Sequence, residues 1–359
     1  MIERQAGDRF DWGGHRSGCE GSTLAKVTYH GDLKEVQGIP ALAALLAAQT
    51  APFDRGEWFA ALAGHCGLKP VFALACEGDR AALLPLMEAR DGLAALANWY
   101  SFRWHPLLSP GAGALLAAIA RDLARRTHRL LLAPLPDESG EAQALARALR
   151  AAGWQVALHR CDSNHVLPVA GRSFATCLQS RPGALRSTLK RKRKRVEVVL
   201  HRRFDADAWA HYEAIYRASW KPEEGSPAFL RSFAETEGAA GRLRLGIGYA
   251  AGAVPRAIAA QLWSVEHGTA YIHKLAHDET AASLSPGTVL TAALLEEVIE
   301  RDRVGLVDFG TGDDRYKRDW MDSVRPRYRI EALNPGNPRA WPGLARLAAR
   351  RLARRGTGL

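Results

Sequence analysis

The densest set of reactive side chains in the sequence is DFGTGDDRYKRDW, residues 308–320. This segment follows an apolar run that predicts a strand over residues 304–309, so its glycines, acids, basic residues and aromatics come at a strand end. Binding and catalytic groups often lie in loops at the edge of a sheet. Asp308 is a candidate general base, or else a loop cap bonded to the amides of residues 310–312. Tyr316 is a candidate general acid, or else a packing residue.

A predicted helix N-terminus lies close by in the sequence. SPGTVLTAALLEEVIERDR predicts a helix over residues 285–301, with Ser285 as N-cap and proline at the first helical position. We expect the amides of Gly287, Thr288 and Val289 to lack intrahelical partners, so they are candidate ligands for a pyrophosphate or another anion. The same pattern also fits a well-capped helix without a ligand.

These two segments are held in place by three short strands that precede them. The segments RLRLGIGYA, AIAAQLWSV and TAYIHKLAHD predict an antiparallel meander over about residues 242–276. With the helix and the strand 304–309, the order is β-β-β-α-β. The last strand must then pair in parallel with the third, and the two diverge beside the helix N-terminus. His273, on the third strand, is the leading candidate base, although a single strand histidine is more often structural.

The rest of the sequence alternates helices with short strands, which predicts an α/β (α+β) fold. A chain of 359 residues suits two domains. Expected elements are a helical segment over 39–66 broken near Pro52, a hairpin over 69–90, a helix over 111–126, a strand and a helix ending at Gly153, a strand pair over 154–169, a basic helix over 183–200 and an aromatic helix over 205–220.

Charge and cysteine content limit the functional classes. The net charge of +11 is concentrated in two segments: residues 181–203 carry ten Lys/Arg against one Glu, and residues 339–359 carry six Arg and no acid. The remaining chain is slightly acidic.

The five cysteines are scattered without a CxxC pair, so we expect neither a disulfide framework nor a metal site. No apolar stretch of membrane-spanning length and no secretory signal are apparent, so a cytoplasmic protein is expected.

Several segments together resemble a known family. They are LKRKRKR, the SWK at residues 219–221, YIHKLAHDETAASLSPGTVL and DFGTGDDRYKRDW, and they are similar to the BioF2-like, or FemAB-like, branch of the GNAT acyltransferases. The resemblance covers residues 180–322. It extends more faintly over residues 35–165, where PFDRGEW and NWYSFRWHPL look like the N-terminal half of the family.

The resemblance implies tandem GNAT-like units, each a mixed, mostly antiparallel sheet flanked by helices. It implies a flexible arm over 1–22, an N-terminal degenerate unit over 23–170, a C-terminal acyltransferase unit over 171–335 and a basic tail over 336–359. An amine would attack an activated acyl group held at the split in the second unit. The acceptor-side residues would be Trp220, Lys221, Lys317 and Trp320, with the 221–227 loop closing over the acceptor. A glutamate of that loop, Glu223 or Glu224, is the alternative base.

The donor and the acceptor remain open at this point. The usual GNAT phosphate signature, Q/R-x-x-G-x-G/A, is absent and SLSPGTV stands in its place, so the donor is acyl-CoA, an acyl carrier protein thioester or an aminoacyl-tRNA. No permanently bound cofactor is expected. We favour an amine on a lipid, such as the sphingoid base of a bacterial ceramide-synthase-type enzyme, or on an envelope sugar.

The basic segments leave the partners open as well. Residues 190–195 and 346–355 predict peripheral contact with an anionic membrane, such as the inner membrane. The alternatives are a FemAB-type transferase that uses charged tRNA, and a non-enzymatic nucleic-acid-binding protein on a degenerate GNAT scaffold.

Overall fold

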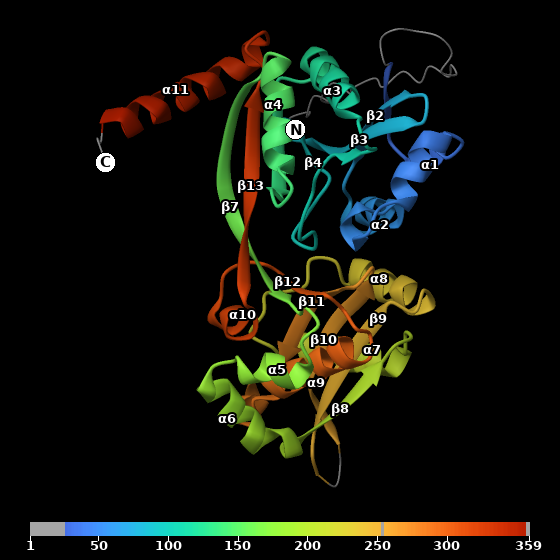
Figure 1. The fold of residues 1–359 in the computed structure, drawn as a ribbon, viewed down its shortest axis with the longest axis vertical. Coiled ribbons are helices and arrows are strands. Elements are labelled where there is room, and N and C mark those ends of the chain that lie inside the picture. The colour runs from blue at the N-terminus through green and yellow to red at the C-terminus, as the bar shows by residue number, and fades with distance from the viewer. Residues whose placement is uncertain (1–25, 253–254, 357–359) are drawn as a thin grey trace, which may run out of the picture.

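The computed structural model describes residues 26–252 and 255–356, with side chains described as far as residue 349. The arm predicted over residues 1–22 lies outside the described residues. Two lobes lie one above the other in Figure 1, and two long strands, β7 (Gln155–Pro168) and β13 (Ser323–Leu333), run from one lobe into the other. The described strands form one 13-stranded mixed sheet flanked by helices, which confirms the α/β class.

The first lobe contains the N-terminal strands of the sheet. Its strands β2 and β3 pair antiparallel around the Glu-Gly-Asp turn, as the sequence predicted. Apolar faces of α3 and α4 pack on this sheet, with Leu116, Ile119, Leu145 and Leu149 buried. The elements are β1 (Val27–His30), α1 (Pro40–Ala47), α2 (Gly56–Cys66), β2 (Pro70–Glu77), β3 (Arg80–Ala89), β4 (Gly92–Ala95), β5 (Leu107–Leu108), α3 (Gly113–Arg126), β6 (Arg129–Leu135) and α4 (Glu141–Ala151).

The second lobe has the predicted β-β-β-α-β order. Strands β9, β10 and β11 form the antiparallel meander, and the long helix α9 crosses over to β12. The elements are α5 (Phe174–Gln179), α6 (Gly183–Lys192), β8 (Val196–His201), α7 (Ala206–Arg217), α8 (Pro227–Ala239), β9 (Leu243–Ala250), β10 (Arg256–Glu266), β11 (Thr269–His277), α9 (Pro286–Glu300), β12 (Leu306–Thr311) and α10 (Arg315–Trp320).

Two of the elements predicted from the sequence differ in the structure. The strand pair expected over 154–169 is the single strand β7, because β13 pairs with it antiparallel from Val166 to Gln155 and holds the polar stretch in the middle extended. The basic helix expected over 183–200 ends at Lys192, and a 3₁₀ turn over Arg193–Arg195 follows. The alternating VEVVL then forms β8, which pairs with the exposed edge of β9.

The two lobes share a core as well as strands. The ring of Trp58 on α2 meets the rings of Phe229 and Phe233 on α8 edge to face, with centroids 5.1 and 5.4 Å apart. All three side chains are buried. Such aromatic contacts add specific geometry to the area they bury. The first lobe therefore packs against the α7–α8 face of the second.

Helix α11 (Trp341–Gly356) projects away from the first lobe and ends near the C that marks the chain end in Figure 1. It includes most of the predicted basic tail. No helix in the described part of the chain combines the length and the apolar character needed to cross a lipid bilayer.

Candidate functional site

Strands β11 and β12 begin side by side and then separate. Their parallel pairing joins Thr269–Tyr271 to Leu306–Asp308 and goes no further, although β11 continues to His277. On its other edge β12 pairs antiparallel with β7. The sequence-based prediction that strand 304–309 pairs beside the third meander strand is confirmed. The sheet therefore opens between the end of β11 and the end of β12.

A cavity of about 540 Å³ lies at this opening. Its walls come from the loop after α7, the end of β11, the first turn of α9, the end of β12 and helix α10. Seven of the residues selected from the sequence are among its lining. The lining residues are Trp220, Lys221, Leu275, His277, Ala282, Ser285, Pro286, Gly287, Thr288, Phe309, Asp314, Tyr316 and Lys317.

The first turn of α9 faces the cavity. Ser285 is at the N-cap with a left-handed φ of 51°, and its side chain makes no capping hydrogen bond. The second and third positions of any helix have no intrahelical acceptor for their amides, and here these positions are Gly287 and Thr288. The expectation was wrong for Val289, whose amide donates to the Ser285 carbonyl at 3.2 Å and whose side chain is buried. The reason is that the N-cap carbonyl already accepts the first intrahelical bond.

Two lysines bring positive charge to the same cavity. Burial lowers the pKa of both Lys221 and Lys317, and neighbouring lysines lower that of Lys221 further. The Lys317 ammonium donates to the Thr311 carbonyl and lies 5.7 Å from the centre of the Phe309 ring. Together with the helix amides, these cations make the cavity suitable for an anionic group of a ligand.

Tyr316 joins α10 to the first turns of α9. Its hydroxyl donates to the Gly287 carbonyl at 2.9 Å and lies 2.7 Å from the Thr291 hydroxyl. The buried Gln261 amide donates to the same two residues, which fixes this turn. Burial raises the pKa of Tyr316 to about 12, so the hydroxyl keeps its proton at neutral pH.

His277 is the histidine that lines the cavity. Its ring lies 4.5 Å from the ring of Trp220, and its Nδ1 would be 3.6 Å from a Cβ atom placed at Gly287. Burial lowers the pKa of His277, so the imidazole is neutral at neutral pH and available to accept a proton. Sequence reasoning passed over this residue, although it stands at the end of the strand that leads to the split.

His273 does not line the cavity. Its ring lies among aromatic rings on the other face of the sheet, 4.7 Å from Phe233 and 5.5 Å from Phe102, and its Nε2 is 2.8 Å from the Ser264 hydroxyl. Burial lowers the pKa of His273 to about 3. An imidazole with such a pKa is a poor proton acceptor at neutral pH.

The other selected residues also lie away from the cavity. Asp308 is buried, and its Oδ1 accepts from the Asn164 amide at 2.6 Å and from the Gly310 backbone N–H at 2.8 Å. This is the loop-cap arrangement considered from the sequence. Trp320 is 1% exposed and belongs to the core beneath α9. Among the described residues, no group of three or more His, Cys, Asp or Glu side chains is placed to hold a metal ion.

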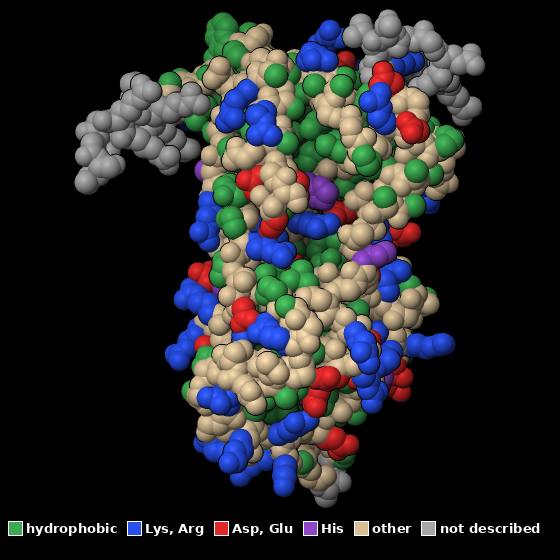
Figure 2. Space-filling model, in the orientation of Figure 1, with side chains coloured by type: hydrophobic (Ala, Val, Ile, Leu, Met, Phe, Trp, Pro, Cys, Tyr) green, Lys and Arg blue, Asp and Glu red, His purple; other side chains and the backbone are tan. Residues whose placement is uncertain are grey.

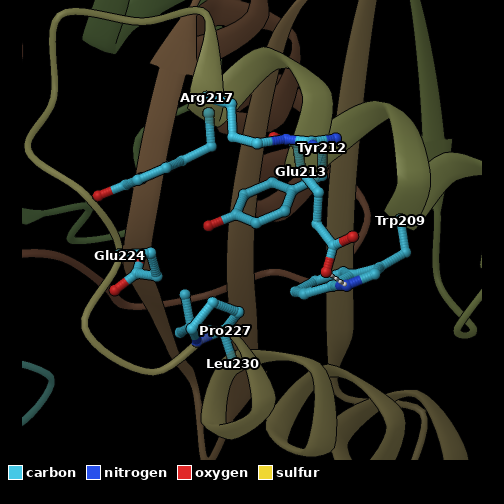
Figure 3. A pocket seen from close by; sticks show the side chains of 8 residues that line it. Trp209, Tyr212, Glu213, Arg217, Glu224, Pro227 and Leu230 are labelled. Atoms are coloured by element: carbon cyan, nitrogen blue, oxygen red, sulfur yellow. Dashed lines mark hydrogen bonds between the residues drawn. The ribbon is translucent and has the colours of Figure 1, made fainter.

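A second, smaller pocket of about 220 Å³ lies between α7 and α8 (Figure 3). Glu224, from the loop before α8, is among its lining residues. Its carboxylate accepts from the Tyr100 hydroxyl at 2.5 Å and pairs with the Lys274 ammonium at 2.9 Å. The loop that supplies Trp220 and Lys221 to the cavity therefore supplies Glu224 to this pocket.

Comparison with known proteins identifies the fold. Residues 183–318 match the family described as an acetyltransferase (GNAT) domain. No curated protein sequence matches the chain significantly. Among solved structures, FemX is similar with a TM-score of 0.59 at 10% identity, covering 86% of this chain and 98% of FemX.

Two further structures have the same fold. L-PGS from Bacillus licheniformis has a TM-score of 0.55 at 12% identity, covering 88% of this chain and 96% of that one. A tandem GNAT protein from the clavulanic acid biosynthesis pathway has a TM-score of 0.52 at 14% identity, covering 85% and 98%. Residues 183–318 thus match a GNAT acetyltransferase domain, and the chain has the fold of FemX and of the tandem GNAT protein.

Proposed function

We propose that this protein is an N-acyltransferase that moves an acyl group from a thioester donor to an amine. The observation that carries the proposal is the cavity of about 540 Å³ at the separation of β11 and β12. It combines amides of a helix N-terminus, two partly buried lysines and a neutral imidazole in one space. These groups meet the separate needs of holding an anionic carrier and of moving a proton.

The proposed donor is acyl-CoA or an acyl carrier protein thioester. The amides of Gly287 and Thr288, with Lys221 and Lys317, would hold the phosphate-bearing part of the carrier. Leu275 and Phe309 line the same cavity and offer apolar contact to the acyl chain. SLSPGTV would therefore serve as a phosphate site although the usual glycine signature is absent.

The proposed reaction forms one bond and breaks one. The amine nitrogen attacks the thioester carbonyl, the new N–C bond forms, and the C–S bond of the tetrahedral intermediate breaks to release the thiol. The amine loses one proton and the leaving sulfur gains one. His277 would accept the proton from the amine, and Tyr316, protonated at neutral pH, would donate to the thiolate.

The proposed acceptor is an amine on a lipid, sphingoid-base-like in its chemistry, or on an envelope sugar. Support comes from the exposed basic block of α6 and the following 3₁₀ turn, residues 190–195, which would bring the protein to an anionic membrane surface. Lysine and arginine side chains (blue) are prominent at the lower end of the molecule in Figure 2, the end that α6 occupies in Figure 1. A cytoplasmic protein held peripherally at the inner membrane fits this arrangement.

A second candidate is an aminoacyl transferase that takes its donor from charged tRNA. The same exposed block favours it, because adjacent lysines and arginines also suit a phosphate backbone. A donor panel decides between the two. The purified protein would be given acyl-CoA, acyl carrier protein thioesters and aminoacyl-tRNA with long-chain and sugar amines.

We expect free thiol and N-acylated product with a thioester donor, measured by a thiol reagent and mass spectrometry. Transfer only from aminoacyl-tRNA would replace the proposal with the second candidate. No transfer from any of the three donors to any amine would reject both.

A further inference from the structure

The pocket between α7 and α8 has aromatic walls. Trp209 and Tyr212 stack with ring centroids 4.6 Å apart, and Tyr216 lies 6.2 Å beyond Tyr212. Pro227 and Leu230 close the pocket from α8. Its volume of about 220 Å³ is below the range of about 300–1,000 Å³ that is usual for whole drug-sized ligands. The pocket therefore fits one end of a larger molecule.

The hydroxyl of Tyr212 has no hydrogen-bond partner in the described part of the protein. The side chain is only 3% exposed, and Figure 3 shows its ring projecting into the pocket between Glu213 and Glu224. A buried hydroxyl left unpaired is unfavourable, because it has lost its hydrogen bonds to water without replacing them. This cost is removed when a bound polar group pairs with the hydroxyl, so the site is built to receive one.

The Glu213 carboxylate also lacks an ion-pair partner in the described part of the protein. It accepts a hydrogen bond from the Trp209 ring N–H at 2.9 Å and forms no ion pair with any described residue. Arg217 lines the same pocket, but its Nε donates to the Glu213 backbone carbonyl at 3.3 Å rather than to a carboxylate. Glu224, by contrast, is paired with Lys274 at 2.9 Å. A cation that binds in the pocket would form an ion pair with the Glu213 carboxylate.

We infer that this pocket binds an organic ammonium group, the amine-bearing end of the acceptor, between the aromatic faces and the Glu213 carboxylate. The inference rests on the proposed function and adds the chemical class that the site selects. Aromatic faces attract cations, more strongly where water is excluded, and a carboxylate adds charge selectivity. An uncharged molecule of the same shape gains neither contribution, so the pocket discriminates by charge.

The pocket and the donor cavity lie on opposite faces of β11. Lys274 pairs with Glu224 on the pocket side of β11, and the next residue, Leu275, lines the cavity on the other side. The loop after α7 contributes to both spaces through Lys221 and Glu224. An amine bound in the pocket thus lies across the end of β11 from the proposed thioester.

Binding of n-octylamine and n-octanol to the full chain without donor tests the inference. These two probes have the same apolar tail, and the amine is charged at pH 7.5. We expect calorimetry to show binding of the amine at least tenfold tighter than binding of the alcohol. Glu213→Gln should remove most of that preference, and Glu213→Lys should weaken amine binding further through repulsion. Neither substitution should change the affinity for octanol.

Two other variants complete the series. Tyr212→Phe keeps the ring and removes the unpaired hydroxyl, so amine affinity should fall several-fold with the fold intact. Glu235→Gln is the matched control, because this glutamate is exposed on α8 and, among the described residues, pairs only with Arg231 at 3.0 Å. Its amine affinity should equal that of the unmodified protein. Equal affinities for amine and alcohol, or an amine affinity insensitive to Glu213→Lys, would overturn the inference.

The same variants separate this inference from the proposed function. With a competent thioester donor and octylamine, Glu213→Gln should raise the KM for the amine and leave the KM for the donor unchanged. If the KM for the amine, measured by thiol release, is the same in Glu213→Gln as in the unmodified protein, the pocket assignment is wrong and the proposal of acyl transfer is unaffected. Glu213-dependent amine binding with no transfer from any donor would support the pocket and reject acyl transfer.

Discussion

His273 and His277 stand four residues apart on β11 and face opposite sides of the sheet. Residues an even number apart on a regular strand share a face. Here Leu262 pairs with Lys274 and Trp263 pairs with Ile272, so His273 is an extra residue in a β-bulge. After the bulge the alternation is reversed. His277 therefore faces the cavity beside α9, whereas His273 faces the aromatic core shared by the lobes.

The first prediction concerns His277. His277→Ala should lower kcat by about 10²–10⁴-fold and leave donor affinity within a few-fold, because a general base acts in the chemical step. Burial lowers its pKa. As the pH decreases, the rate should therefore stay constant past the usual imidazole pKa and fall only at lower pH, where protonation removes the base. The variant should lack this acid limb. His211→Ala, an exposed histidine on α7, is the control. Near-normal turnover with a folded His277→Ala protein would reject this assignment.

The second prediction concerns the pH dependence of stability at His273. Its pKa is about 3 in the folded protein and about 6.5 in the unfolded chain. Between these values the unfolded chain binds the additional proton, so the free energy of unfolding rises with pH and decreases as the pH falls below 6.5. At about 1.4 kcal/mol per pH unit, the loss between pH 7.5 and pH 5 is about 2 kcal/mol.

His273→Leu should remove this contribution. Urea denaturation of both proteins at the two pH values measures the difference, which cancels the titration of other groups. The same variant should retain measurable turnover, because its side chain lines neither the cavity nor the smaller pocket. Equal pH dependence in the two proteins would show that His273 is not buried in a neutral state.

The third prediction concerns Gly287. An added Cβ would lie 3.6 Å from His277 Nδ1 and 3.9 Å from the Tyr316 hydroxyl, which is ordinary contact, so Gly287→Ala should be tolerated. The branched side chain of Gly287→Val should obstruct the approach of an anion to the amides and raise the donor KM tenfold or more. Gly64→Val is the matched control, since a Cβ at this glycine of helix α2 meets nothing within 4 Å. An unchanged donor KM in Gly287→Val would remove α9 from the donor site.

The fourth prediction concerns the basic block at residues 190–195. Changing Lys190, Lys192 and Lys194 to Gln should weaken binding to anionic vesicles about 100-fold, at about 1 kcal/mol per lysine near the surface. The free energy of unfolding should change little, because exposed charges contribute little to stability. A co-sedimentation assay at low and high salt measures the effect.

A charge-matched control is available elsewhere on the surface. Lys26, Lys34 and Lys69 are exposed, and their change to Gln removes the same charge from the first lobe. Vesicle binding by this control should be nearly unchanged. Salt-independent vesicle binding would contradict the prediction, and strong binding to tRNA without binding to vesicles would favour the second candidate function.

The sequence alone determined the elements around the site. Apolar periodicity and a Ser-Pro helix start predicted α9, and turn residues between short β runs predicted the meander of β9, β10 and β11. The β-β-β-α-β order requires a parallel last strand. These signals are local, so they appear in a single sequence, and they brought Trp220, Lys221, Gly287, Tyr316 and Lys317 to one cavity.

Only the tertiary structure decided which face each side chain takes. A bulge depends on how β10 pairs with β11, and no residue in YIHKL announces it, so His273 and His277 lie on opposite faces instead of sharing one, as they would on a regular strand. The length of β7 depends on β13, which begins 155 residues after β7 ends and was not recognised as a strand. The pocket at Glu213 and Glu224 required α7 and α8 to meet. Such pairings are non-local, because each is stabilised by contacts between segments far apart in the chain.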